Sequence, residues 1–323
     1  MPDVITCGEM LIDFVSTVSG VTLQEAPAFE KAPGGAPANV AVGLARLGIP
    51  TGFIGKLGDD EFGRFLQSVL DSNGVDTSRL LLTEEARTAL AFVSLRQDGE
   101  REFMFYRHPS ADMLFAPYEV HVPYIARARV FHYGSITLGA EPSASATLHA
   151  AVVARENGLF VSYDPNLRLN LWPSEEAARE GMLRGWEHAH LIKISEEEAA
   201  FLTGKDDIEQ AAEELWHDNL RLLAITQGGQ GSTVFTPNVG VYVPSFEVQV
   251  VDTTGAGDAF LAGLLFSLYP NLDHVMRGDI GEEDLIQAVR FANAAGALTT
   301  TKRGAIPALP TLEEVQALLA AEQ

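Results

Sequence analysis

Short β-type runs alternate with helical patterns along most of this 323-residue chain, and that rhythm restricts the fold more than any other feature. The expected strands are 4–7, 51–56, 129–134, 159–164, 190–194, 221–226 and 246–251. The expected helices are 37–47, 60–73, 142–157, 174–188, 196–202, 257–269 and 282–300. Such alternation is typical of an α/β fold, with a mostly parallel sheet covered by helices on both faces. We expect a single α/β domain over residues 1–323.

Two segments interrupt this rhythm. The β-type runs 88–95 and 101–107 flank residues 97–100, whose Asp-Gly pair is a strong hairpin signal. Residues 15–33 also look extended and lack a helical period. We therefore expect about 15–33 and 88–110 to form a small β lid beside the main sheet, because lids of this kind close over active sites and exclude water. A decorative hairpin and a contact between two copies in a homodimer are the alternatives.

The charge and the apolar runs exclude several classes of partner. The chain has 44 Asp and Glu against 22 Lys and Arg, a formal charge of −22, whereas a nucleic-acid-binding protein needs a basic surface. The longest apolar stretch, 259–269, is about half of what a bilayer crossing requires. The single cysteine, Cys7, forms no internal disulfide and fits a reducing compartment, and the N-terminal residues lack a signal-peptide pattern. We expect a cytoplasmic protein that binds neither nucleic acid nor membrane.

Residues 252–258 (Asp-Thr-Thr-Gly-Ala-Gly-Asp) are the most informative stretch. The helix that follows is apolar on nearly every side, so it is predicted to be buried with its N-terminus facing the interior or a cleft. Gly255, Ala256 and Gly257 leave backbone N–H groups bare there, which predicts an anion site. A lone Asp258 in the first turn would be read as structural, but beside a phosphate it can take a proton from an attacking hydroxyl.

Two further glycine-rich turns are candidate ligand sites. Gly34 and Gly35 precede the helix that carries Asn39, so backbone can approach a ligand whose hydroxyls the amide would bind. Residues 226–231 (Thr-Gln-Gly-Gly-Gln-Gly) end a strand, where ligands of open α/β sheets bind. Their spacing lacks a dinucleotide fingerprint, β-type residues follow instead of a helix, and no P-loop pattern occurs in the chain.

These residues resemble those of a known family. GGAPANVAVGLARLG (34–48) and DTTGAGDAFLAG (252–263) are similar to the two signatures of the PfkB, ribokinase-like carbohydrate kinases. The resemblance covers nearly the whole chain. Within that family, FYRHPSADML (105–114), YDPNLRLNLW (163–172) and KISEEEAAFLTG (193–204) look most like fructokinases. The resemblance implies a ribokinase-like fold and an ATP-dependent sugar kinase that makes fructose 6-phosphate.

The resemblance also implies roles for individual residues. Asp258 matches the catalytic base, the residues 255–257 match the anion hole, and Arg168 adds positive charge. The residues expected near the sugar are Asp13, Gly34, Gly35, Asn39, Tyr106, Arg107 and Asn166. Those expected near ATP are Thr226, Gly228, Gly229, Gly231 and Asn293.

Two cation sites follow from the same resemblance. Glu198 is expected to order hydrated Mg²⁺ below the phosphates, although Ser195 stands where many relatives have asparagine, and an acidic run also suits the start of a helix. Asp252, Thr254 and Gly304 match a position where many relatives bind a monovalent cation such as K⁺ through backbone carbonyls.

Other functions remain open at this point. A 2-keto-3-deoxygluconate kinase shares these features, and its carboxylate substrate would need an extra cation, for which Arg107 is available. A Rossmann-type oxidoreductase would also give alternating strands and helices but needs a glycine fingerprint. A catalytically silent sugar-binding protein on a kinase fold would predict a lost base or a broken anion hole.

Overall fold

The computed structural model describes residues 1–95 and 101–322, and the expected hairpin turn at 97–100 lies outside them. The described residues form a nine-stranded sheet in the order β13-β12-β11-β10-β9-β8-β1-β4-β5. Its strands are β1 (Val4–Cys7), β4 (Thr51–Gly58), β5 (Asp76–Thr83), β8 (Val130–Gly134), β9 (Phe160–Asp164), β10 (Leu191–Ser195), β11 (Leu222–Thr226), β12 (Gly231–Phe235) and β13 (Gly240–Pro244). The pairs from β5 to β11 are parallel, and β12 and β13 add antiparallel strands at one edge. The expected α/β fold is confirmed.

Helices cover both faces of this sheet because successive residues of each buried strand point to opposite sides. In β1, Val4 packs into one core and Ile5 into the other, and Leu191 and Ile192 of β10 divide in the same way. One face is covered by α1 (Ala36–Arg46), α8 (Ala256–Leu268), α9 (Leu272–Arg277) and α10 (Glu282–Thr299). The other is covered by α3 (Val122–Ile125), α4 (Ser143–Glu156), α5 (Glu175–Trp186), α6 (Glu196–Thr203) and α7 (Ile208–Leu215).

Two more helices extend the first layer. The helix α2 (Glu61–Ser72) packs with α1 against β4 and β5, and α11 (Leu312–Ala321) packs on α10. No helix among the described residues has the length and apolarity to span a membrane.

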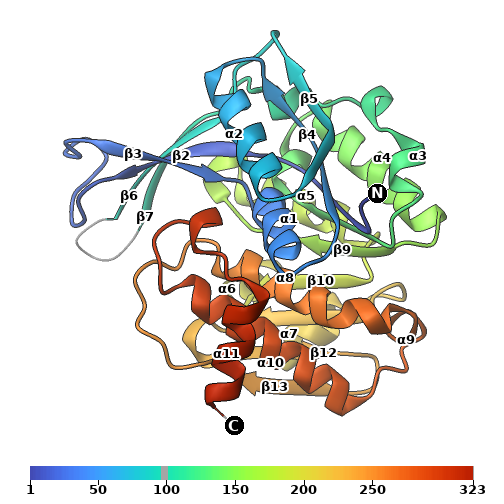
Figure 1. Ribbon diagram of the computed structural model, residues 1–323. Coiled ribbons are helices and arrows are strands. Elements are labelled where there is room, and N and C mark those ends of the chain that lie inside the picture. The colour runs from blue at the N-terminus through green and yellow to red at the C-terminus, as the bar shows by residue number, and fades with distance from the viewer. Residues whose placement is uncertain (96–100, 323) are drawn as a thin grey trace.

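A separate four-stranded sheet extends from one side of the main body (Figure 1). Its order is β3-β2-β6-β7, with β2 (Leu11–Ser16), β3 (Phe29–Gly34), β6 (Leu90–Leu95) and β7 (Arg101–Tyr106). This sheet, which we call the lid, matches the expected β subdomain. It begins at Leu11, earlier than the expected residue 15, because β2 follows β1 after only a short turn.

The differences from the expected elements lie at the edge of the main sheet. Residues 246–251 form no strand, contrary to expectation, because β13 already occupies that edge beside β12. Phe246 packs instead against α10 and α11, while Val250 and Val251 are exposed. The edge strands β5 and β13 were not anticipated from the sequence. Each alternates buried with exposed residues over part of its length and so lacks the continuous apolar run of a central strand.

The helices α1 and α8 of this layer pack in direct contact. A Cβ atom on Gly43 of α1 would lie 2.8 Å from the Cβ of Ala262 on α8, which is closer than two methyl groups can approach. The absence of a side chain at Gly43 thus sets how near the two helices lie.

We expect Gly43→Leu to lower the free energy of unfolding by about 1–3 kcal/mol, because the added side chain must force α1 and α8 apart. Urea denaturation at constant pH measures the change. Glu180→Leu, which adds the same side chain on the exposed face of α5, should change stability by less than about 0.5 kcal/mol. Equal effects of the two substitutions would contradict this view of the contact.

Candidate functional site

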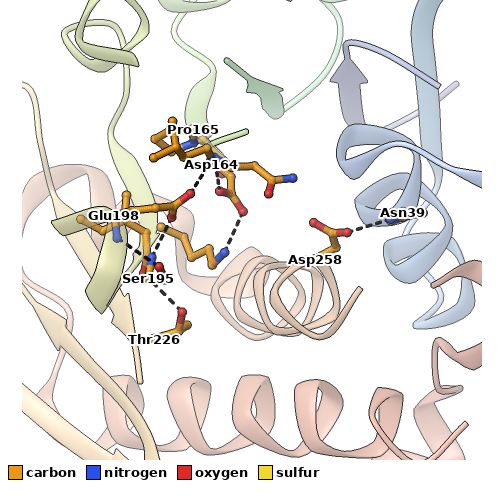
Figure 2. A network of polar contacts seen from close by, with 12 residues as sticks. Asn39, Asp164, Pro165, Ser195, Glu198, Thr226 and Asp258 are labelled. Atoms are coloured by element: carbon orange, nitrogen blue, oxygen red, sulfur yellow. Dashed lines mark hydrogen bonds and ion pairs between the residues drawn. The ribbon is translucent and has the colours of Figure 1, made fainter. Parts of the chain in front are cut away.

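The carboxyl ends of neighbouring parallel strands bring the candidate residues to one edge of the main sheet. Asp164 ends β9, Ser195 ends β10 and Thr226 ends β11. The N-terminus of α8 approaches the same edge, so that Asp258 lies opposite Asp164 and Glu198 (Figure 2). Ligands of open α/β sheets bind at this edge.

The first turn of α8 has the geometry of an anion site. Gly255 is the N-cap residue and adopts the left-handed region with φ of 80°, which favours glycine. A Cβ atom there would also lie 2.8 Å from the Cβ of Ala305, so glycine is required for space as well. Neither Gly255 nor Gly257 has a side chain to shield the backbone N–H groups of this turn. The helix offers these groups no partner, and Ala256 N donates instead to the carbonyl oxygen of Thr253 at 3.3 Å.

Asp258 is buried in the first turn of α8 and is held by Asn39 of α1. Asn39 Nδ2 donates a hydrogen bond to Asp258 Oδ2 at 2.7 Å (Figure 2). Burial, together with the negative charge of Asp164, raises the pKa of Asp258 from 3.8 to about 6, although the hydrogen bond from Asn39 opposes the rise. A carboxylate with a pKa near 6 is ionised at neutral pH and is still basic enough to accept a proton.

The lid and α1 carry four of the residues expected at the sugar, Asp13, Gly34, Gly35 and Asn39. The register places Asp13, Ala91 and Phe105 in one row across β2, β6 and β7. A side chain at Gly34 would collide with the Asp13 carboxylate, and a Cβ on Gly35, whose φ is 112°, would lie 2.6 Å from the Glu9 carbonyl oxygen. On α1, Asn39 Oδ1 is buried and has no hydrogen-bond partner among the described residues, so it can accept from a ligand hydroxyl.

The two other lid residues differ sharply. Tyr106 is 58% exposed and packs edge-on against Phe92. Arg107 is buried, and its Nε donates to Asp112 Oδ2 at 2.8 Å while Nη2 also contacts that carboxylate. Burial raises the pKa of nearby Glu9 to about 7, with Arg107 opposing the rise. Arg107 is therefore neutralised by an internal partner and lies in an acidic environment.

A buried ion pair lies across from Asp258. Lys193 of β10 donates from Nζ to Asp164 Oδ2 at 3.0 Å, and the other Asp164 oxygen accepts from Asn166 N at 3.1 Å. The carboxylates around Lys193, Asp164 first among them, raise its pKa despite burial, so it stays charged. Asn166 adopts a positive φ of 49°, stabilised by this turn. Arg168 is partly exposed, with Nη1 donating to Leu167 O at 2.8 Å.

Glu198 is buried and both of its carboxylate oxygens accept backbone hydrogen bonds, Oε1 from Leu167 N at 2.6 Å and Oε2 from Ser195 N at 2.8 Å. Ser195 Oγ in turn accepts from Glu198 N, which completes a capping box at the start of α6. Among the described residues, no group of three or more His, Cys, Asp or Glu side chains could hold a metal. This donor set fits hydrated Mg²⁺ that is bound mainly by nucleotide phosphates, with carboxylates accepting from its waters.

The residues expected near ATP lie at the turn between β11 and β12 and on α10. Thr226 ends β11, and Gly228 and Gly229 would meet nothing within 4 Å if they carried a Cβ, so this turn faces open space. Gly231 is needed by the fold, since a side chain there would collide with the carbonyl oxygen of Val243. Asn293 is buried on α10, and its amide is engaged by Ser232 Oγ at 2.9 Å and by the carbonyl oxygen of Val243 at 2.9 Å. Asn293 therefore fixes the wall of this region.

The residues expected around a monovalent cation are linked by one carboxylate. Asp252 Oδ1 accepts from Thr254 N at 3.0 Å and from Thr254 Oγ1 at 2.7 Å. Asp252 Oδ2 accepts from Gly304 N at 2.9 Å. The loop before α8 and the turn around 304 are thus tied together directly behind the anion site.

Sequence reasoning assigned no role to Lys193 or Asp164. The available signal was chemical: Lys193 is a lysine within an otherwise apolar strand, Leu191–Ser195, and such a strand is buried on both faces. A buried cation requires a partner, and the acidic end of a neighbouring strand supplies one.

The chain is similar over its whole length to known sugar kinases. Residues 1–312 match the pfkB family carbohydrate kinases. Fructokinase-1 of Zea mays is 55% identical over 98% of this chain and 97% of its own length. A crystal structure of fructokinase from Xylella fastidiosa with bound ATP has a TM-score of 0.89 and 36% identity over 100% of this chain and 99% of its own.

A second solved structure includes the sugar. Fructokinase from Vibrio cholerae O395, in a form with fructose, ADP and calcium ion bound, has a TM-score of 0.85 and 36% identity over 98% of this chain and 99% of its own. The expected family and ribokinase-like fold are confirmed, and the oxidoreductase alternative is wrong.

We expect Asp258→Asn to stabilise the ligand-free protein by up to about 3 kcal/mol at pH 7–8. One pKa unit corresponds to about 1.4 kcal/mol, and the folded protein holds the Asp258 proton up to about pH 6, compared with 3.8 for the ordinary group. Stability relative to the Asn variant therefore falls as the pH rises from about 4 to 6.

Urea denaturation of both proteins at pH 4, 6 and 8 measures this difference, which should be smallest at pH 4. An advantage of the variant that is equal at all three pH values would rule out ionisation of Asp258 as its cause.

Proposed function

Because the chain belongs to the pfkB family of carbohydrate kinases, we propose that it is a fructokinase that converts D-fructose and ATP to fructose 6-phosphate and ADP. The position of Asp258 supports this proposal most directly. A buried carboxylate with a raised pKa, fixed by Asn39, lies in the first turn of a helix whose amides form an anion site.

Asp258 acts as the general base of an in-line transfer. It takes the proton of the fructose 6-hydroxyl as that oxygen forms a bond to the γ-phosphorus of ATP. The bond between the γ-phosphorus and the bridging oxygen breaks, and its electron pair leaves with ADP. Asn39 Nδ2 orients the carboxylate through Oδ2, and Asn39 Oδ1 accepts a hydrogen bond from the sugar.

Negative charge on the transferring group is stabilised by the chain around it. The backbone amides of 255–257 form the anion hole, and Arg168 adds positive charge from the β9 side. Mg²⁺ bound to the ATP phosphates supplies further charge neutralisation. Glu198, whose oxygens already accept backbone amides, would hold the hydrated ion through its water ligands.

The environment of Arg107 favours fructose over 2-keto-3-deoxygluconate. A keto-acid substrate needs a free cation for its carboxylate, and Arg107 is already paired with Asp112. The Asp13 carboxylate lies against Gly34, and Glu9, with a pKa of about 7, is partly ionised at neutral pH. This environment disfavours an anionic sugar and suits hydroxyl recognition by Asp13, Gly34, Gly35, Asn39, Tyr106 and Asn166.

ATP lies along the ends of β10 and β11, with Thr226 and the open turn of Gly228 and Gly229 beside its phosphates. Gly231 and Asn293 shape the adjacent wall. The backbone carbonyls of Asp252, Thr254 and Gly304 would hold K⁺ if the chain binds it. The Asp252 carboxylate, which holds these loops together, supports that assignment.

Coupled ADP production from Mg-ATP across fructose, 2-keto-3-deoxygluconate, ribose, tagatose and glucose tests the proposal. We expect fructose to give the highest kcat/KM. Asp258→Asn should lower kcat by about 10³-fold or more while sugar and ATP binding persist, because only the proton acceptor is lost. Near-normal turnover of that variant would contradict the mechanism, and a preference for the keto-acid would contradict the substrate. No turnover with any sugar would indicate a silent fold.

The lid also provides a surface for a second copy of the chain. Val15 and Met104 of this small sheet and Val18, just after β2, are exposed apolar residues, and edge strands readily pair with further strands. We assign the lid to a homodimer in which it closes over the sugar. A cytoplasmic location stays a prediction that rests on the sequence.

Light scattering after size exclusion should give about twice the 34.8 kDa of one chain. Met104→Glu should shift the protein toward monomer, because a buried interface tolerates an unpaired carboxylate poorly. Tyr118→Glu, at a residue of the main body that is 87% exposed, is the control and should leave the mass unchanged. A wild-type mass equal to that of one chain at all concentrations tested would contradict the proposed homodimer.

A further inference from the structure

Lys193 lies where the carboxylates of the main sheet meet the anion hole. Its Nζ is 3.0 Å from Asp164 Oδ2, and a Cβ atom on Gly257 would lie 2.8 Å from Nζ and 3.5 Å from Cε. The ammonium group is therefore in contact with the first turn of α8. Because Gly257 has no side chain, its backbone amide is left uncovered and there is room for the Lys193 ammonium group.

This position is electrostatically unusual. The N-terminus of a helix carries partial positive charge, so it favours anions and disfavours cations. Lys193 nevertheless directs its ammonium there, with its carboxylate partner Asp164 on the strand side. An anion between the ammonium and the amides of α8 would interact favourably with both positive groups, and a phosphoryl group has the necessary charge and size.

The Lys193 ammonium group has N–H donors that the hydrogen bond to Asp164 does not use. A lysine side chain carries three N–H donors, and the hydrogen bond to Asp164 uses one of them. Within residues 1–95 and 101–322 Nζ makes no other hydrogen bond. The side chain is buried and short of rotational freedom, so its remaining donors are fixed in direction before any ligand arrives.

Arg168 does not fill the same role in this arrangement. It is partly exposed, and its Nη1 donates to the carbonyl oxygen of Leu167. Lys193 is buried and in contact with the anion hole, whereas Arg168 is partly exposed and acts on Asp258 through its charge without a direct contact.

We propose that Lys193 is a catalytic residue that contacts the transferring γ-phosphoryl group, together with the amides of 255–257. This inference rests on the proposed fructokinase function. During transfer the new oxygen–phosphorus bond forms, the bond to ADP breaks, and the proton goes to Asp258. Lys193 keeps its own proton throughout and stabilises charge on the equatorial phosphoryl oxygens.

A purely structural role predicts something different. If Lys193 only neutralised Asp164, its loss would weaken the fold and would affect every nucleotide alike. A contact with the γ-phosphoryl group predicts a selective loss for nucleotides that carry that group. Affinity for ADP and for the non-hydrolysable ATP analogue AMP-PNP therefore separates the two roles.

Titration calorimetry with Mg²⁺ compares the two nucleotides in wild type, Lys193→Met and Lys193→Arg. For Lys193→Met we expect AMP-PNP to bind at least about tenfold more weakly, with ADP within about threefold of wild type. We expect kcat with fructose to fall by about 10²–10³-fold. Lys193→Arg keeps the positive charge, so its losses of AMP-PNP affinity and of kcat should be smaller than those of Lys193→Met. Lys205→Met, at a surface lysine paired with Glu214, is the control and should match wild type.

Equal weakening of ADP and AMP-PNP, or a kcat within about threefold of wild type, would overturn the proposal. Thermal melts establish that each variant is folded. If Lys193→Met does not fold, Lys193→Gln takes its place, because glutamine keeps a hydrogen-bond donor for Asp164 and removes the charge. The ratio of the AMP-PNP and ADP affinities of that variant then tests the proposal. Failure of the proposed function is distinguishable, because wild type itself would then show no turnover of fructose.

Discussion

The close approach of α1 and α8 is the contact on which the rest of this structure depends. Gly43 lets the two helices approach until Asn39 and Asp258, 219 residues apart in the chain, share a hydrogen bond of 2.7 Å. Asp258 is thereby kept buried and oriented in the first turn of α8. Removing a carboxylate from water costs stability, so the protein sacrifices some folding free energy to hold a base ready.

Positive charge is scarce in this acidic chain and is used selectively. Arg107 lies under the lid and is neutralised by Asp112, whereas Lys193 lies at the strand ends with only part of its hydrogen-bonding capacity used. The sugar side is consequently rich in acceptors, and on the phosphate side Lys193 and the amides of α8 supply donors. A neutral polyol and a polyanion can therefore bind side by side without competing for the same groups.

Much of the fold could be predicted from the sequence because central parallel strands are continuous apolar runs between clear helix signals. Edge strands such as β5 and β13 carry no such pattern, and the β-type residues 246–251 had no free edge left to join. Asp258 and Asn39 belong to compact motifs that the sequence singles out, and the fold brings these two side chains into contact.

Lys193 was missed because its meaning depends on Asp164 and Gly257, which only the fold brings together. Glu198 shows the reverse case. The spacing of Ser195 and Glu198 is that of a capping box, a local signal that the sequence alone contained.

The lid is joined to the catalytic helix pair without any intervening linker. Strand β3 ends at Gly34, Gly35 caps α1, and Asn39 lies in the first turns of that helix. Any movement of the lid strands on closing over a sugar is therefore transmitted along a few peptide units to the side chain that orients Asp258. Under the proposed mechanism, water could not trigger this movement, so ATP would be protected from wasteful hydrolysis when no sugar is present.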